Sequence, residues 1–143
     1  MKLEIDLSAN LTEPYVVIHT GEITKDIRKL CNYIQNLEAV IAVYENDNIV
    51  ILQPEDIYMI VSKSRSVDIF CKEKQYVSKK CLYEFEDILR HDFMRISKTT
   101  IINLKQIDRV EPSFNGMLIV LKNGKKDYIS RKYLPEFKKY LGL

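Results

Sequence analysis

The sequence lacks most of the patterns on which enzymes and membrane proteins depend. It has only four glycines, and none stands in a GxGxxG or GxxxxGK pattern, so no phosphate-cradling nucleotide loop is expected. Its two histidines, His19 and His91, have no recognisable serine or cysteine partner. No apolar run approaches the roughly 18 residues that a transmembrane helix needs. We therefore expect no catalytic residues, no cofactor and no small-molecule substrate.

The cysteines and the first residues indicate where the protein works. Cys31, Cys71 and Cys81 form no CxxC pair and have no histidine at metal-ligand spacing, so no metal site is expected. An odd number of cysteines is typical of reduced, mostly buried thiols. The N-terminus, MKLEIDLSAN, has charged residues where a secretory signal needs an apolar stretch. Together these features predict a cytoplasmic location.

Charge is unevenly distributed along the chain. Residues 1–61 contain 4 Lys+Arg against 10 Asp+Glu, a balance of −6, whereas residues 62–143 contain 18 against 10, a balance of +8. Such asymmetry is typical of a polyanion-binding part joined to a part with another task. The alternative is that charges happen to segregate on solvated faces.

The first 47 residues predict a small accessory β-β-α-β unit. Alternation of apolar and charged residues over 2–7 predicts a strand, and the β-branched run over 15–18 predicts a second. Apolar residues at steps of three and four from 23 to 37 predict a helix. A further strand is expected over 39–44.

Residues 48–143 predict a second domain of short antiparallel strands with two short helices, so the fold class is α+β, mainly β. The best hairpin signals are Asn115-Gly116 and Asn123-Gly124. Helices are expected over about 82–90 and from Leu134 to Leu141. Strands are expected over 49–52, 57–61, 67–71, 75–78, 95–96, 107–114, 117–121 and 127–129. The expected core includes Phe93, Phe114, Tyr133 and Phe137.

Three clusters of hydroxyl and basic side chains fall between the expected strands of this second domain. They are Ser62-Lys63-Ser64-Arg65-Ser66, Ser97-Lys98-Thr99-Thr100 and Ser130-Arg131-Lys132. Such side chains, held at loop tips by a β-scaffold, suit contacts with phosphates and base edges rather than bond-making. Taken singly, each cluster is equally well described as an ordinary solvated turn.

The spacing of several motifs resembles that of the LytTR family, a group of bacterial DNA-binding domains. The resemblance rests on the segments LQPEDIYMI, FMRISKTTIINLKQI and LKNGKKDYISRKY, and it covers roughly residues 48–143. The matching positions are Phe93, Arg95, Ser97-Lys98, Ile102-Asn103 and Ser130-Arg131. This sequence departs from the family at Ser97, where many members have a histidine.

The resemblance implies a sequence-specific transcriptional regulator that binds double-stranded DNA. Family members of this kind place loops, not a recognition helix, into successive major grooves. The residues implied as base contacts are Arg65, Ser66, Lys98 and Arg131. The phosphate candidates are Lys63, Lys79, Lys80, Ser97, Thr99, Asn103 and Lys132. For Asn103 a structural turn is an equal alternative, and Arg95 is expected to pair with an acid.

The resemblance also implies partners. Two copies are expected to bind as a homodimer or in pairs on repeated sites, and a membrane protein encoded by a neighbouring gene is a further expected partner. From the charge distribution alone, the alternative is a protein-interaction adaptor whose basic face docks on an acidic protein.

Overall fold

The computed structural model describes residues 1–35, 37, 40–89 and 92–143. Within these ranges the chain forms three α-helices, ten strands and two short 3-10 helices. The helices are α1 (Lys25–Gln35), α2 (Leu82–Ile88) and α3 (Leu134–Leu141). The first strands are β1 (Ile41–Glu45), β2 (Asn48–Leu52), β3 (Met59–Ser62), β4 (Val67–Phe70) and β5 (Gln75–Ser78). The remaining strands are β6 (Phe93–Arg95), β7 (Thr100–Asn103), β8 (Ile107–Ser113), β9 (Gly116–Leu121) and β10 (Lys126–Tyr128).

Seven strands form one antiparallel sheet in the order β2-β1-β5-β4-β3-β7-β6, and β10-β9-β8 form a second. Successive side chains of a strand point to opposite faces of its sheet. One face of the large sheet packs on α2, where Ile60 and Ile101 meet Phe85. The other face, through Met59 and Ile102, packs on the small sheet and on Phe137 of α3.

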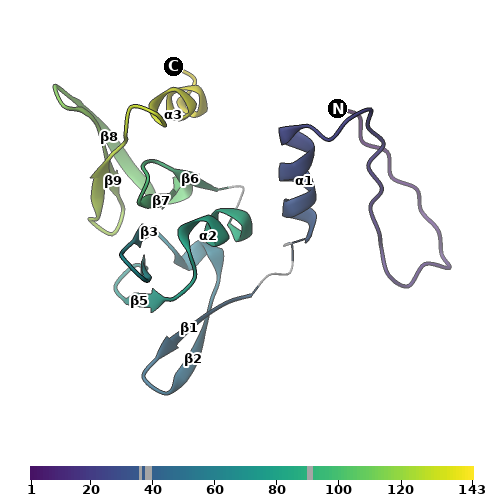
Figure 1. Ribbon diagram of the computed structural model, residues 1–143, viewed down its shortest axis with the longest axis horizontal. Helices are drawn as coiled ribbons and strands as arrows, with labels where there is room; N and C mark the ends of the chain where they lie inside the picture. The colour runs from purple at the N-terminus through teal and green to yellow at the C-terminus, as the bar shows by residue number, and fades with distance from the viewer. Residues whose placement is uncertain (36, 38–39, 90–91) are drawn as a thin grey trace.

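Two hydrophobic cores therefore lie on the two sides of one sheet. The elements that cover them, α2 for one core and β8, β9 and α3 for the other, are labelled in Figure 1. The small sheet and α3 cover their side only over part of the large sheet, because the residues they bury come from β3, β6, β7 and the end of β4. The strands β5, β1 and β2 continue beyond this cover. The large sheet thus has one end enclosed on both faces and one end enclosed on a single face.

The α+β, mainly β, architecture expected from the sequence is confirmed. The strand over 75–78 has the expected bounds, and both expected helices of the second domain are present as α2 and α3. Strand β7 was not expected, because the hydroxyl residues at its start resemble a turn. The placement of Phe114 in the core was wrong, since it is fully exposed in the turn between β8 and β9.

The β-β-α-β arrangement expected at the N-terminus needs correction. Helix α1 and strand β1 are present, but residues 1–24 contain neither of the two expected strands. Alternating residues form a strand only when another strand supplies hydrogen-bond partners, and no neighbouring strand pairs with residues 1–24. Strand β1 pairs with both β2 and β5, so it belongs to the large sheet. A division of the chain near residue 47 would fall in the β1–β2 turn.

Candidate nucleic-acid interface

The register of the large sheet brings several loops to one end of it. Strand β3 ends at Ser62, and β7 starts beside it, because Thr100 pairs with Val61. The backbone N–H of Ser62 donates to the carbonyl oxygen of Thr99 over 2.7 Å. The loop 62–66 and the turn 97–99 are therefore neighbours, although more than thirty residues separate them in the chain.

Lys79 and Lys80 lie at the same end of the sheet. Strand β5 ends at Ser78, which pairs with Val67 at the start of β4. The backbone N–H of Lys80 donates to the hydroxyl of Ser78 over 3.2 Å, which holds the chain in a turn where it leaves the strand. Both lysine side chains are exposed.

The segment Ser130-Arg131-Lys132 completes this group of loops. The backbone N–H of Ser130 donates to the carbonyl oxygen of Ile96 over 2.8 Å, immediately before the turn 97–99. Strand β10, which precedes this segment, is also tied to the large sheet, because the Thr100 hydroxyl at the start of β7 donates to the Asp127 carboxylate over 3.1 Å. Arg131 and Lys132 are exposed. We call residues 62–66, 78–80, 97–99 and 130–132 the loop edge.

The loop 62–66 presents Arg65 at its tip. The loop is closed by a backbone bond from Lys63 N–H to the Ser66 carbonyl oxygen, 2.8 Å. The Lys63 ammonium lies 2.6 Å from the carboxylate of Asp68, whose side chain is only 5% exposed. A buried carboxylate is costly without a partner, so Lys63 serves as the counter-charge of Asp68. Arg65 is exposed and Ser66 is half-buried.

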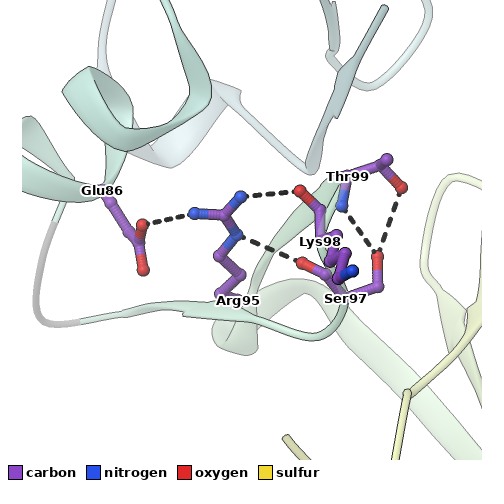
Figure 2. Close-up of polar contacts among 5 residues, drawn as sticks. All are labelled: Glu86, Arg95, Ser97, Lys98 and Thr99. Atoms are coloured by element: carbon purple, nitrogen blue, oxygen red, sulfur yellow. Dashed lines mark hydrogen bonds and ion pairs between the residues drawn. The ribbon is translucent and has the colours of Figure 1, made fainter. Parts of the chain in front are cut away.

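The backbone of the turn 97–99 is fixed by hydrogen bonds from the Arg95 side chain (Figure 2). Its guanidinium donates to the carbonyl oxygens of Ser97, 3.1 Å, and Lys98, 2.6 Å. The third contact is an ion pair with Glu86 of α2, 2.8 Å. Bonds from a planar guanidinium fix direction as well as distance. Arg95 thus pairs with an acid, as expected, and it also fixes the backbone that carries Lys98.

Within the turn, the hydroxyl of Ser97 supplies a further constraint. It accepts a hydrogen bond from the backbone N–H of Thr99 over 3.2 Å and lies 3.3 Å from the Thr99 hydroxyl. Both contacts are drawn in Figure 2. The side chains of Lys98 and Thr99 are exposed. The turn is therefore rigid in its backbone while the Lys98 ammonium is open to solvent.

Asn103 lies away from the loop edge, at the other end of β7. It is 2% exposed, its amide N–H donates to the Ile57 carbonyl oxygen over 2.9 Å, and its amide oxygen accepts from Lys105 N–H. Both halves of the amide are therefore used inside the protein. Of the two roles left open by the sequence, the structure supports the turn. We exclude Asn103 from the candidate DNA contacts.

Two partners of the loop edge had not been singled out from the sequence. Glu86 is the acid that Arg95 reaches, and Asp127 accepts from Thr100. Neither stands at a diagnostic spacing from its partner, because the sheet and α2 create both contacts. Glu86 comes nine residues before Arg95, and Asp127 comes 27 residues after Thr100.

The three cysteines are less buried than expected. Cys81 is exposed and the other two thiols are half-buried, so the expectation of mostly buried cysteines was wrong. Burial raises the pKa of the Cys71 thiol to about 11, with a smaller contribution from Asp56.

Across the described ranges, no group of three or more His, Cys, Asp and Glu is placed to hold a metal ion. His91 lies outside the described residues.

No helix in the described part of the chain has both the length and the apolar character needed to cross a membrane.

Each described helix is followed or preceded along the chain by a strand. α1 leads into β1, α2 lies between β5 and β6, and α3 follows β10. In the described residues, therefore, no two helices are consecutive, and a helix-turn-helix motif is not formed.

Known proteins resemble this chain in sequence and in fold. The family model of the LytTr DNA-binding domain matches residues 47–142. A Staphylococcus aureus protein (strain NCTC 8325 / PS 47), named an uncharacterized HTH-type transcriptional regulator, is 29% identical over 100% of this chain and 99% of its own length. A protein of the same description from strain MRSA252 is 28% identical with the same coverage.

A solved structure has the same fold as the larger part of the chain. It is the LytTr DNA-binding domain of a protein described as a methyl-accepting/DNA response regulator from Bacillus cereus. The two are 24% identical with a TM-score of 0.67, covering 73% of this chain and 97% of that one. Since the family model covers about two-thirds of the chain, this protein belongs to the LytTR family of DNA-binding domains.

Proposed function

We propose that this protein is a sequence-specific transcriptional regulator that reads double-stranded DNA with its loop edge. In this proposal, Arg65, Lys98 and Arg131 enter successive major grooves, and the neighbouring lysines and hydroxyls contact the phosphates. No catalytic step is part of the proposal, in keeping with the family.

One observation carries the proposal. Four separate segments of the chain meet at one end of one sheet, and each brings an exposed cation there. DNA binding needs a cationic field for affinity and a few rigidly held side chains for sequence. The loop edge has both, because its turns are closed by backbone bonds and Arg95 fixes the central turn.

The reading element is a set of loops rather than a helix. The staphylococcal relatives are named HTH-type regulators, but in the described residues of this chain no two α-helices follow one another without a strand between them. A turn at the end of a β-sheet is narrow enough to approach base edges without a helix. The proposal thus assigns no base contact to α1, α2 or α3.

Roles within the loop edge follow from chemistry. The Arg131 guanidinium can donate two bonds to the two major-groove acceptors of a guanine, whereas the Lys98 ammonium acts as a point charge on a base edge or phosphate. Arg65, with Ser66 beside it, takes the third base position. The proposed phosphate contacts are Lys79, Lys80, Ser97, Thr99 and Lys132. Lys63 contributes less, because Asp68 already neutralises its charge.

Paired binding is a further part of the proposal. Two copies bound on one side of a duplex require half-sites separated by about 10 base pairs or a multiple, because only then do the same grooves face the protein. A cytoplasmic location and a membrane protein encoded by a neighbouring gene stay predictions from the sequence.

The test starts from a preferred site selected out of a random duplex pool. Arg131→Ala and Lys98→Ala should each cost about 1–3 kcal/mol of discrimination between the preferred site and a single-base variant. Both side chains are exposed, so we expect unchanged thermal unfolding. The matched controls are Arg28→Ala and Lys25→Ala on α1, which remove the same charges away from the loop edge.

Unchanged site preference in the Arg131→Ala, Lys98→Ala double variant would refute the proposed base contacts. The same assay separates DNA reading from the adaptor alternative. An adaptor that docks on an acidic protein would bind duplexes of equal length and charge equally well. A DNA reader ranks them by sequence.

A further inference from the structure

An apolar surface remains uncovered on the large sheet. Strands β1, β2 and β5 turn four side chains toward α2, where they are buried: Ile41, Val43, Leu52 and Tyr76. Their opposite side chains are apolar as well, and they are exposed. They are Ala42, Tyr44, Ile49, Ile51 and Val77, which we call the apolar face.

The register shows that these residues are contiguous. Tyr44 pairs directly with Ile49 on one side and with Val77 on the other, and Ala42 pairs with Ile51. Directly paired residues lie on the same face of a sheet. Tyr44 is 72% exposed and Ile49 is 62% exposed, although both sit in regular strands.

The apolar face continues a surface that is covered elsewhere. Val77 pairs with Asp68, and Asp68 pairs with Val61, which packs under the small sheet. The ion pair of Asp68 with Lys63 therefore marks the border between the covered and uncovered parts of this face. A contiguous exposed apolar patch rimmed by polar residues is typical of a protein–protein contact.

The N-terminal segment, residues 1–24, has the matching property. Its side chains Leu3, Ile5 and Leu7 alternate with charges and are among the most exposed apolar residues of the chain, and Val16 and Val17 are also exposed. The segment contains no strand, so its strand-forming pattern is unused in this chain. The exposed apolar side chains of the N-terminal segment and those of the apolar face can therefore bury each other.

The charge of the N-terminal segment argues against two other binding partners, nucleic acid and an anionic lipid surface. Residues 1–24 contain one lysine and four carboxylates, a balance of −3. Nucleic acid and anionic lipid surfaces both repel such a segment. A neutral apolar sheet face does not.

The segment is on the wrong side of its own sheet to cover its own apolar face. It is joined to α1, which contacts α2, and α2 covers the opposite face of the sheet. In Figure 1 the segment lies beyond α1, on the side away from the sheet. Reaching its own apolar face would require the chain to pass around the sheet, whereas the apolar face of a second copy is accessible.

We propose that two copies of this protein exchange their N-terminal segments, each segment covering the apolar face of the other copy. The five side chains of the apolar face are too few for a stable interface alone, which needs about 800 Å² per partner. Two exchanged segments supply the missing area, and the contact closes with two-fold symmetry. The proposal does not depend on DNA binding and is tested without DNA.

The experiment measures the mass of the full chain by sedimentation over a concentration series. We expect a dimer for the natural chain, and an apparent mass about two-fold lower for Ile5→Glu and, separately, for Ile49→Lys. Phe114→Lys changes another exposed apolar residue, in the β8–β9 turn away from the apolar face, and should stay dimeric. Leu7→Glu and Ile51→Lys replace the first pair if either variant fails to fold by circular dichroism.

Mixing the two monomeric variants tests the exchange itself. In a mixed dimer the intact segment of the Ile49→Lys copy meets the intact apolar face of the Ile5→Glu copy, and the altered pair has opposite charges. We expect native mass spectrometry to show the mixed dimer. A natural chain that stays monomeric, variants that all stay dimeric, or a mixture that stays monomeric would each overturn the proposal.

Discussion

The N-terminal segment and the sheet body that starts at β1 use similar residues with opposite results. Both contain apolar residues in strand-like patterns, but the body buries most of them in two cores, and only its apolar face is exposed, while the segment leaves them in solvent. The two regions differ in whether a neighbouring strand or layer packs against them. A period-2 pattern becomes a strand only where another strand or a packed layer accepts it.

The largest effect is expected from truncating the core. Phe137 is fully buried between α3 and the small sheet, so Phe137→Ala should lower the free energy of unfolding by about 3–5 kcal/mol. Tyr15→Ala removes an aromatic ring from the N-terminal segment and should change it very little, because Tyr15 is exposed. Urea denaturation of each variant in the Ile49→Lys background, which is expected to be monomeric, measures both changes in the free energy of unfolding. Equal losses would abolish the contrast between the two regions.

A second test concerns buried polar contacts. Asn103→Ala leaves the Ile57 carbonyl and the Lys105 N–H without their partner, and should cost about 1–3 kcal/mol of stability. Asn10→Ala in the N-terminal segment is the control, since Asn10 is exposed. A stable Asn103→Ala variant with weakened DNA binding would instead return Asn103 to the list of DNA contacts.

A third test concerns the positioning of Lys98 by Arg95. Arg95→Met removes three charge-assisted contacts from the turn, and should weaken binding to the preferred site roughly ten-fold, about 1.4 kcal/mol. In an Arg95→Met background, Lys98→Ala should cost less than it does alone, because the lysine is already misplaced. Arg28→Met on α1 controls for loss of an arginine. Additive losses would show that Arg95 does not act through Lys98.

The smallest expected effect is a pH dependence of the body. The Cys71 thiol has its pKa raised from 9.0 to about 11, mainly by burial. The folded state therefore keeps a proton that the unfolded state loses, and the free energy of unfolding falls as the pH rises from 9.0 toward 11. Cys71→Ala should flatten this slope, and Cys31→Ala on α1 is the control. An unchanged slope in Cys71→Ala would assign it to other groups.

Local patterns predicted the body well where the chain turns on itself. Asn115-Gly116 and Asn123-Gly124 marked two hairpins of the small sheet, and Gly116 and Gly124 have the positive φ angles that such turns favour. The pattern failed where long-range partners decide. In residues 2–7 apolar and charged residues alternate as in a strand, but no neighbouring strand pairs with them. Thr100 starts strand β7 because β3 and β6 flank that strand.

The candidate site shows the same limit. Motif spacing predicted Lys98 and Arg131 as candidate DNA contacts, because the resemblance matches short segments in a fixed order. It did not identify Glu86 or Asp127, since these contacts arise only when α2 and β10 pack beside the turn. The Asn103 amide fits a turn or a DNA contact equally well until its burial is known.

The central claim is that separate loops at one end of the sheet contact DNA together. Backbone amide shifts, recorded by nuclear magnetic resonance as the preferred duplex is added, test it directly. The account predicts that the largest changes fall in residues 62–66, 97–99 and 130–132, with little change in α1 and the β1–β2 turn. Changes concentrated in a helix, or in only one of the three loops, would contradict it.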